Sequence, residues 1–256
     1  MKKRNQNKSS LPNKEIDQAA PKEIRLNRYI ANAGICSRRE ADSLISTGQI
    51  SLNGTIVTEL GTKVQPGDKV KFKNQLITPE KPVYVLLNKP KDFITTMDDP
   101  ENRKTVMQLV DNAGPERIYP VGRLDRNTTG LLLFTNDGDL AKKLSHPSGN
   151  VKKIYQVDLN RPIEQQDFEA IRTGVELEDG LAQVDDLEVV SPDNQSLGIE
   201  IHIGRNRIVR RIFEHLGYDV VRLDRVMFAG LTKRDLPRGK WRHLTYREIN
   251  QLKRLK

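Results

Sequence analysis

Short apolar runs separated by turn residues divide most of the chain into strands and helices. The clearest run is LLLF at residues 131–134, which the turn residues NDG at 136–138 follow. A continuous apolar run between turn signals is typical of a fully buried strand. We therefore expect a core strand here, and the loop GRLDRNTTG at residues 122–130 leads directly into it.

Residues 25–48 show apolar positions at helical spacing in two segments. The first segment ends at Gly34, and the second begins at Ser37, with Glu40 in place to complete a capping box. Asn53 and Gly54 then predict a tight hairpin between two short strands. We expect two helices packed on a small sheet, which together form a domain over residues 23–73.

The rest of the chain alternates strand-like and helical segments after a linker at residues 74–82. Frequent strands at hairpin-like spacing with interspersed helices predict an α+β domain over residues 83–256, built on a mainly antiparallel, mixed β-sheet with flanking helices. Residues 1–22 are polar and lysine-rich, which predicts a disordered basic arm.

The charge balance indicates a polyanionic partner. Lys and Arg number 43 against 34 Asp and Glu, a formal net charge of +9. No apolar run is long enough to span a bilayer, and no basic helix carries aromatic anchors, so we expect nucleic acid and no membrane. A single cysteine, Cys36, excludes an internal disulfide and multi-cysteine metal sites, and the expected location is cytoplasmic.

Several cofactor signatures are missing from the sequence. Neither a GxxxxGK phosphate loop nor a GxGxxG turn occurs, and the four histidines lack metal-ligand spacing. We therefore expect no nucleotide cofactor and no metal. The remaining candidate for chemistry is Asp125, which stands between Arg123 and Arg126 on the loop before the core strand. A surface ion pair is the alternative interpretation of this carboxylate.

Two groups of arginines crowd predicted helix starts, where cations oppose the helix dipole unless phosphates are near. They are Arg25, Arg28, Arg38 and Arg39 in the first domain, and Arg205, Arg207, Arg210 and Arg211 in the second. Each group predicts RNA binding. For the first group a merely solvated face is the alternative, and in the second an arginine that pairs with Asp125 would account for one of the four. Tyr155, on a predicted strand, is either an ordinary strand aromatic or a stacking platform for an unstacked base.

Two sets of motifs resemble known families. The segment RLNRYIANAGICSRREADSLISTGQISLNG resembles the small alpha-L RNA-binding module. The segments VGRLDRNTTGLLLFTNDGDL, KKIYQV, GRNRIVRRIFEHLGY and VVRLDRVMFAG resemble pseudouridine synthases, and LLNKP together with the module resembles the branch that modifies ribosomal RNA at single sites. The segments TTMDDPENRKTVMQLV and GLTKRDLPRGKWRHLTYREINQLK look most like the large-subunit enzymes of type B, with type F a near competitor.

The resemblance implies roles for three side chains in catalysis. Asp125 matches the catalytic aspartate, which acts on a flipped-out uridine while its glycosidic bond is broken. Tyr155 matches the tyrosine that packs on the flipped uracil. Arg210 matches the basic residue that pairs with the aspartate.

Three further residues take expected positions from the same resemblance. Leu223 matches the hydrophobic residue that lines the pocket, and Arg123 the residue that fills the gap left by the flipped base. Lys89 is expected near the site by analogy only. Isomerising uridine to pseudouridine involves no net redox change or group transfer, which agrees with the expectation of no cofactor.

The expected partner is large-subunit ribosomal RNA or the assembling large subunit, bound by a monomer. Two alternatives stay open at this point. One is a synthase for small-subunit ribosomal RNA, and the other is a non-catalytic RNA-binding assembly factor.

Overall fold

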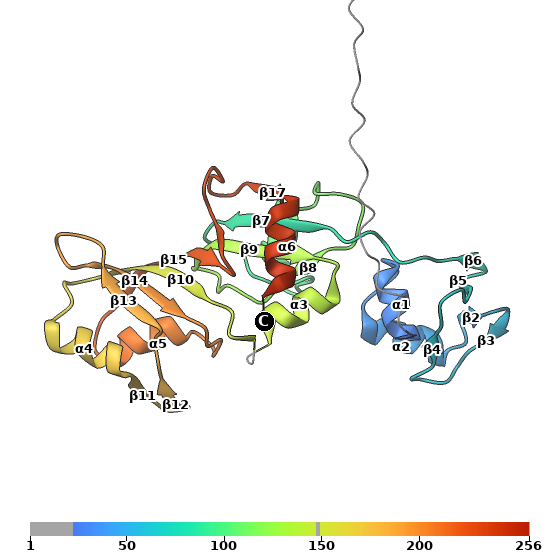
Figure 1. Cartoon of the computed structure of the whole chain (residues 1–256), viewed down its shortest axis with the longest axis horizontal. Coiled ribbons are helices and arrows are strands. Elements are labelled where there is room, and N and C mark those ends of the chain that lie inside the picture. The colour runs from blue at the N-terminus through green and yellow to red at the C-terminus, as the bar shows by residue number, and fades with distance from the viewer. Residues whose placement is uncertain (1–22, 147–148, 256) are drawn as a thin grey trace, which may run out of the picture. The chain divides into compact units, whose positions relative to one another are not determined.

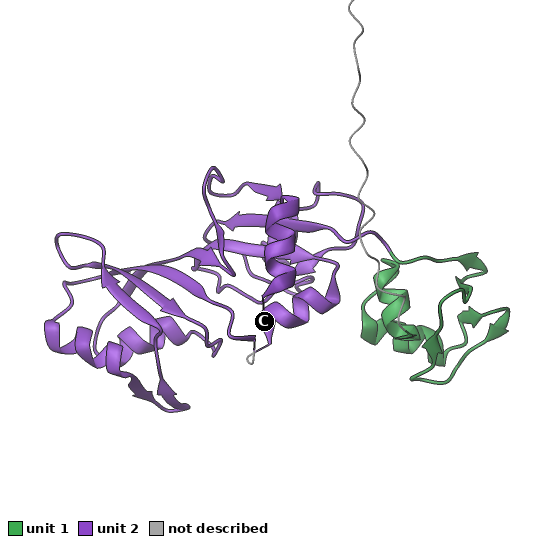
Figure 2. Ribbon diagram, viewed as in Figure 1, with its two compact units in different colours: residues 1–79 green, residues 80–256 purple. Residues whose placement is uncertain are grey.

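Figure 1 shows the computed structural model, which describes residues 23–146 and 149–255. The chain divides into two units, Met1–Pro79 and Glu80–Lys256, which Figure 2 colours separately. The basic arm predicted over residues 1–22 lies outside the described residues.

Two helices of the first unit, α1 (Leu26–Asn32) and α2 (Arg38–Ser46), pack on each other. The Oγ atom of Ser37 accepts a hydrogen bond from the Glu40 amide at 3.3 Å, and the Glu40 carboxylate accepts one from the Ser37 amide at 2.7 Å. These bonds satisfy two amide groups that a helix start leaves without partners. The predicted capping box is therefore confirmed.

The strands of the first unit form two small antiparallel sheets. The larger has the order β3 (Thr55–Ile56), β2 (Ile50–Leu52), β5 (Val70–Phe72) and β6 (Gln75–Leu76), and the smaller pairs β1 (Ile24–Arg25) with β4 (Lys63–Val64). Asn53 and Gly54 connect β2 to β3 with φ angles of 52° and 88°. Positive φ at both central residues is what a type I′ turn requires, so the predicted hairpin is confirmed.

The segment predicted as a linker, residues 74–82, begins as part of the first unit. Its strand β6 pairs with β5, and Ile77 is buried in the core of that unit. The polar residues of this segment suggested a loop because a two-residue strand is too short to show an alternating pattern.

A nine-stranded mixed sheet forms the second unit. Its main order is β13 (Asp186–Val189), β14 (Ser196–Ile201), β10 (Lys153–Leu159), β15 (Val220–Phe228), β9 (Thr129–Thr135), β7 (Tyr84–Lys89) and β17 (Trp241–His243). β16 (Leu231–Thr232) pairs with β15, and β8 (Tyr119–Pro120) pairs with β9. The pairing of β15 with β9 is parallel and the others are antiparallel, as predicted for a mainly antiparallel mixed sheet.

The neighbouring strands β7 and β9 are buried along their whole length. Val85 and Leu87 belong to one core cluster, whereas Tyr84 and Leu86 belong to another. Because both faces of the sheet are covered here, the sequence reads as a continuous apolar run and not as an alternating one. The strand predicted from the run LLLF is confirmed.

Helices cover the sheet of the second unit. They are η1 (Val106–Leu109), α3 (Gly138–Ser145), α4 (Gln165–Thr173), α5 (Ile208–His215) and α6 (Tyr246–Arg254), with a separate hairpin of β11 (Val175–Leu177) and β12 (Gly180–Ala182). In Figure 1, α3 and α6 lie by β7 and β9, while α4 and α5 lie by β13 and β14. α3 and α6 thus pack into one core cluster, and α4 and α5 into the other.

The parallel strands β9 and β15 approach each other most closely at Gly130. A Cβ atom there would lie 2.3 Å from the Arg225 backbone oxygen, and the φ angle of Gly130 is 107°. A side chain at this position would therefore push the strands apart. The glycine places the loop that precedes β9 directly beside β15.

Candidate active site

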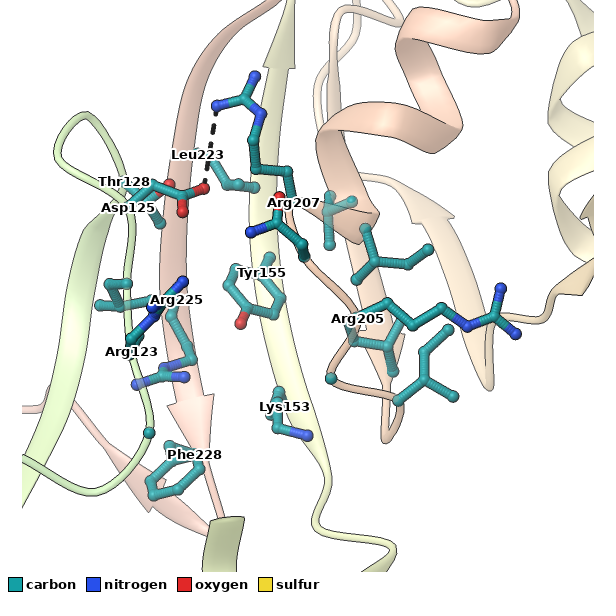
Figure 3. Close-up of a pocket in the computed structure, with 18 of the residues that line it drawn as sticks. Arg123, Asp125, Thr128, Lys153, Tyr155, Arg205, Arg207, Leu223, Arg225 and Phe228 are labelled. Carbon is teal, nitrogen blue, oxygen red and sulfur yellow. Dashed lines mark ion pairs between the residues drawn. The ribbon is translucent and has the colours of Figure 1, made fainter. Parts of the chain in front are cut away.

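A cavity of about 380 Å³ is lined by the loop before β9, by β10, by β15 and by the start of α5. Its volume lies within the ~300–1,000 Å³ that is usual for small-molecule pockets. Figure 3 shows that the side chains of Asp125, Tyr155 and Leu223 lie around one space. Asp125 is the only carboxylate among the described residues that line this cavity.

The Asp125 carboxylate faces Arg207, which comes immediately before α5. Their Oδ2 and Nη1 atoms are 4.0 Å apart, and the side chains are 36% and 45% exposed (Figure 3). Arg207 has φ and ψ of 47° and 28°, a left-handed conformation that is uncommon for arginine. Because solvent reaches both groups, the ion pair contributes on the order of 1 kcal/mol or less.

Arg210 lies three residues further along α5 and makes a different contact. It is 8% exposed, and its Nη1 atom donates to the Val220 carbonyl at 2.7 Å. Burial lowers the pKa of Arg210, and the nearby Arg207 lowers it further, while Asp125 opposes both effects. The ion pair expected between Asp125 and Arg210 is therefore made by Arg207, because α5 directs Arg210 toward β15.

Lys89, at the end of β7, holds the loop that carries Asp125. Its side chain is fully buried, and its Nζ atom donates to the carbonyls of Pro90 (3.2 Å), Asp125 (3.0 Å), Arg126 (3.2 Å) and Thr128 (2.8 Å). Burial lowers the pKa of Lys89 to about 8, although the charge of Asp125 opposes this. The residue expected near the site by analogy is thus a support beneath the loop.

Tyr155 and Leu223 come from neighbouring strands and both line the cavity. Tyr155 on β10 is 8% exposed, and Leu223 on β15 is 4% exposed. Leu223 lies opposite Val157, two residues along β10 from Tyr155. Side chains two residues apart share a face of a sheet, which is why the tyrosine and the leucine reach the same space.

Lys153 and Arg225 also line the cavity but were not singled out in the sequence. Lys153 stands two residues before Tyr155, and Arg225 stands two residues after Leu223. Because side chains alternate between the two faces of a strand, Lys153 lies on the same face as Tyr155, and Arg225 lies on the same face as Leu223. This alternation is the signal in the sequence by which both residues could have been found.

Arg205 and Arg211 hold the hairpin of β11 and β12 against the start of α5. Arg205 donates to the carbonyls of Gly180 (2.7 Å) and Leu181 (2.8 Å), and Arg211 donates to the Asp179 carboxylate at 3.2 Å. Part of the positive charge predicted to bind RNA is therefore paired within the protein. Arg205 lines the cavity as well.

Arg123, expected to fill the gap left by the base, and most of the arginines expected to bind RNA in the first unit are accessible. Arg123 is exposed on the loop before β9 and lines the cavity. In the first unit Arg25, Arg38 and Arg39 are exposed, and Arg28 is partly buried.

In residues 23–146 and 149–255, no group of three or more His, Cys, Asp or Glu side chains could hold a metal ion. Within the same part of the chain, no helix combines the length and the apolar character needed to cross a membrane.

Comparisons with known proteins agree with the motifs in both units. A family model described as RNA pseudouridylate synthase matches residues 83–215, and an S4 domain model matches residues 24–70. The ribosomal large subunit pseudouridine synthase B of Bacillus subtilis is 40% identical, over 90% of this chain and 96% of that protein. The dual-specificity RNA pseudouridine synthase RluF of Escherichia coli K12 is 37% identical, over 91% of this chain and 79% of that protein. A crystal structure of a pseudouridylate synthase matches with a TM-score of 0.63 at 30% identity, covering 90% of this chain and 99% of that one.

Proposed function

The chain belongs to the RNA pseudouridylate synthase family, and from this premise we propose that it converts a uridine of large-subunit ribosomal RNA to pseudouridine. Similarity to a large-subunit synthase over 90% of the chain supports this target. The substrate is the free RNA or the assembling large subunit, and the enzyme acts as a cytoplasmic monomer. The observation that carries the proposal is a cavity that both Asp125 and Tyr155 line. Asp125 supplies the only carboxylate among the described residues of this lining.

The reaction exchanges one bond of the nucleoside for another. The bond between C1′ of the ribose and N1 of the uracil breaks, and a bond between C1′ and C5 forms. C5 loses a proton and N1 gains one, so the product is an isomer of the substrate. We assign to Asp125 the carboxylate that acts on the uridine while the first of these bonds is broken.

The uridine has to leave its stack before the carboxylate can reach it. Flipping costs a few kcal/mol, which contacts with the enzyme must offset. Stacking of the uracil on Tyr155 contributes about 1–3 kcal/mol, as such base–aromatic contacts do. We assign to Arg123, which is exposed on the loop beside the cavity, the role of filling the gap that the base leaves.

The detached uracil must stay beside the ribose until the new bond forms. Leu223 contributes an apolar wall to the cavity, and Arg207 supplies a positive charge 4.0 Å from Asp125. Holding two reacting groups together favours their recombination over escape. Arg210, buried against β15, supports the same wall of the site.

Tritium release from RNA labelled at C5 of uridine tests the reaction, because C5 loses its hydrogen only when pseudouridine forms. We expect release from large-subunit ribosomal RNA or from its assembling particle. Release only from small-subunit RNA would place the target in the other subunit. Binding to either RNA without any release would instead leave the chain as an RNA-binding assembly factor.

Sequencing of pseudouridine in ribosomal RNA from cells with and without the protein identifies the target in vivo. We expect one large-subunit site to be lost and to return when the gene is restored. An unchanged large-subunit pattern would contradict the proposed target.

A further inference from the structure

Arg225, on β15, is a buried cation without a counter-charge among the described residues. It is 3% exposed and lines the cavity. Its Nε atom donates to the Leu131 carbonyl at 2.8 Å, but its Nη2 atom is buried without a hydrogen-bond partner. A buried donor left unsatisfied costs about 1–3 kcal/mol, and more when it is charged. Such a group is expected to have an acceptor in the functional complex.

A second cation, Lys153 on β10, lines the same cavity. Its Nζ atom donates to the His202 carbonyl at 2.6 Å, whereas an ammonium group has three donors. Burial and, to a smaller extent, the charge of Arg225 together lower the pKa of Lys153 to about 8, with Asp185 opposing. The two cations repel each other in a site from which solvent is partly excluded. An anion bound between them would reduce this repulsion.

The strand register fixes where these cations stand relative to the proposed uracil site. Arg225 lies directly opposite Tyr155, and Lys153 lies opposite Phe228. The Arg225 guanidinium is 4.6 Å from the centroid of the Phe228 ring, which restrains its orientation. Lys153 is two residues from Tyr155, roughly 7 Å along the strand. Figure 3 places Lys153 and Phe228 on the far side of Tyr155 from Asp125.

We propose that Arg225 and Lys153 form a subsite for a phosphate group of the RNA, next to the flipped uridine. The identity of the anion as an RNA phosphate rests on the proposed function. Phosphate oxygens accept hydrogen bonds from a guanidinium in a parallel pair and from an ammonium as a point charge. The subsite holds the phosphate on one side of Tyr155 while Asp125 meets the ribose on the other.

Binding of single nucleotides tests the subsite without requiring turnover. Uridine, uridine 3′-monophosphate and uridine 5′-monophosphate are each titrated into the full chain and followed by NMR. We expect one of the two monophosphates to bind about tenfold more tightly than uridine, the effect of one charge-assisted contact. Inorganic phosphate should compete with that monophosphate and not with uridine.

Three variants separate the subsite from general effects of charge. Arg225→Gln and Lys153→Gln should each remove most of the preference for the monophosphate. Arg222→Gln is the matched control, because Arg222 lies on the same strand, is 51% exposed and does not line the cavity. Because Arg225 is buried, its variant is checked by near-ultraviolet circular dichroism, and Lys153→Gln carries the test if Arg225→Gln does not fold.

The outcomes distinguish this inference from the proposed function. If neither monophosphate binds better than uridine, or if the preference survives in Lys153→Gln and in folded Arg225→Gln, the subsite is wrong, even when tritium release from RNA is normal. If the preference is present and lost as expected while no RNA releases tritium, the phosphate subsite stands and the proposed reaction fails.

Discussion

The buried ammonium of Lys89 holds the loop that presents Asp125, through hydrogen bonds to four backbone carbonyls. Lys89→Met would remove this donor from all four carbonyls, of which those of Asp125 and Arg126 keep the amides of Thr128 and Asp92 as donors. We expect a loss of about 2–4 kcal/mol in the free energy of unfolding. We also expect kcat to fall about 100-fold, because a displacement of about 1 Å at a reacting group has that effect.

Urea unfolding and single-turnover tritium release measure these two losses. The matched control is Lys91→Met, since Lys91 is exposed two residues away. Equal behaviour of the two variants would contradict the supporting role of Lys89.

Arg207 and Arg210 differ in their surroundings, and their substitutions should therefore have different effects. Arg207→Gln removes a partly exposed charge 4.0 Å from Asp125, so we expect kcat to fall roughly fivefold with little change in stability. Arg210→Gln removes the buried donor to the Val220 carbonyl, so we expect a loss of about 1–3 kcal/mol in stability. Thermal unfolding and single-turnover kinetics on both variants measure these effects. A loss of stability in Arg207→Gln and a loss of kcat alone in Arg210→Gln would contradict the expectation.

At the scale of elements, helix α6 is anchored to β17 by an ion pair between Glu248 and Arg242. Two hydrogen bonds of 2.7 and 2.9 Å join the side chains. These bonds, together with those that Glu248 accepts from Thr245, lower the pKa of Glu248 from 4.5 to about 2. Since the folded pKa lies below the unfolded value, the stabilisation is complete above about pH 4.5 and is lost as the pH falls toward 2. Solvent screening reduces it to on the order of 1 kcal/mol.

Glu248→Gln should therefore lower the free energy of unfolding by about 1 kcal/mol at pH 7, with the difference from wild type vanishing near pH 2. Urea unfolding across this pH range measures the difference. Glu169→Gln, in the exposed pair with Arg172 at 3.6 Å, is the control and should change stability less. A difference that stays constant with pH would contradict the ion pair as its cause.

Local signals predicted the elements, while pairing between distant strands needed the structure. The capping box of Ser37 and the hairpin at Asn53 follow from neighbouring residues alone, and the sequence showed both. The parallel contact of β9 with β15 joins residues far apart in the chain, and β10 and β15 shift register between Ile154 and Tyr155. No local pattern encodes such a shift, so the sequence did not place Arg225 opposite Tyr155.

The contacts of the arginines around α5 could not be predicted from the sequence either. Which one faces Asp125 depends on the residue at which the helix begins, and predicted helix boundaries are uncertain by a few residues. The pairing of Arg211 with Asp179 depends on a hairpin 32 positions away. Positive charge alone predicted that this region binds phosphate. It could not show which arginines pair with groups of the protein and which are left to bind RNA.

At the scale of the whole molecule, an S4 domain and a synthase domain share one chain. Arg38 and Arg39 are exposed at the first turn of α2 in the S4 domain. If both contact phosphates, their replacement by alanine should weaken RNA binding and reduce the slope of log K against log salt by about 1.5. Filter binding at several salt concentrations measures the slope.

The control for this pair removes two exposed arginines of the synthase domain, Arg172 and Arg234. We expect the control to change the slope less, and circular dichroism to show that both variants are folded. An unchanged slope in the Arg38 and Arg39 variant would mean that this face of the S4 domain does not dock on RNA.

The central claim is that the Asp125 carboxylate performs the chemistry on a flipped uridine. Asp125→Asn keeps the shape of the side chain and removes its charge, and the loop stays held by Lys89 through backbone atoms. The decisive measurement is single-turnover tritium release by this variant from large-subunit RNA, with the RNA affinity measured in parallel. We expect release to be abolished while the Kd changes less than about twofold. Turnover comparable to that of the wild type would contradict the account.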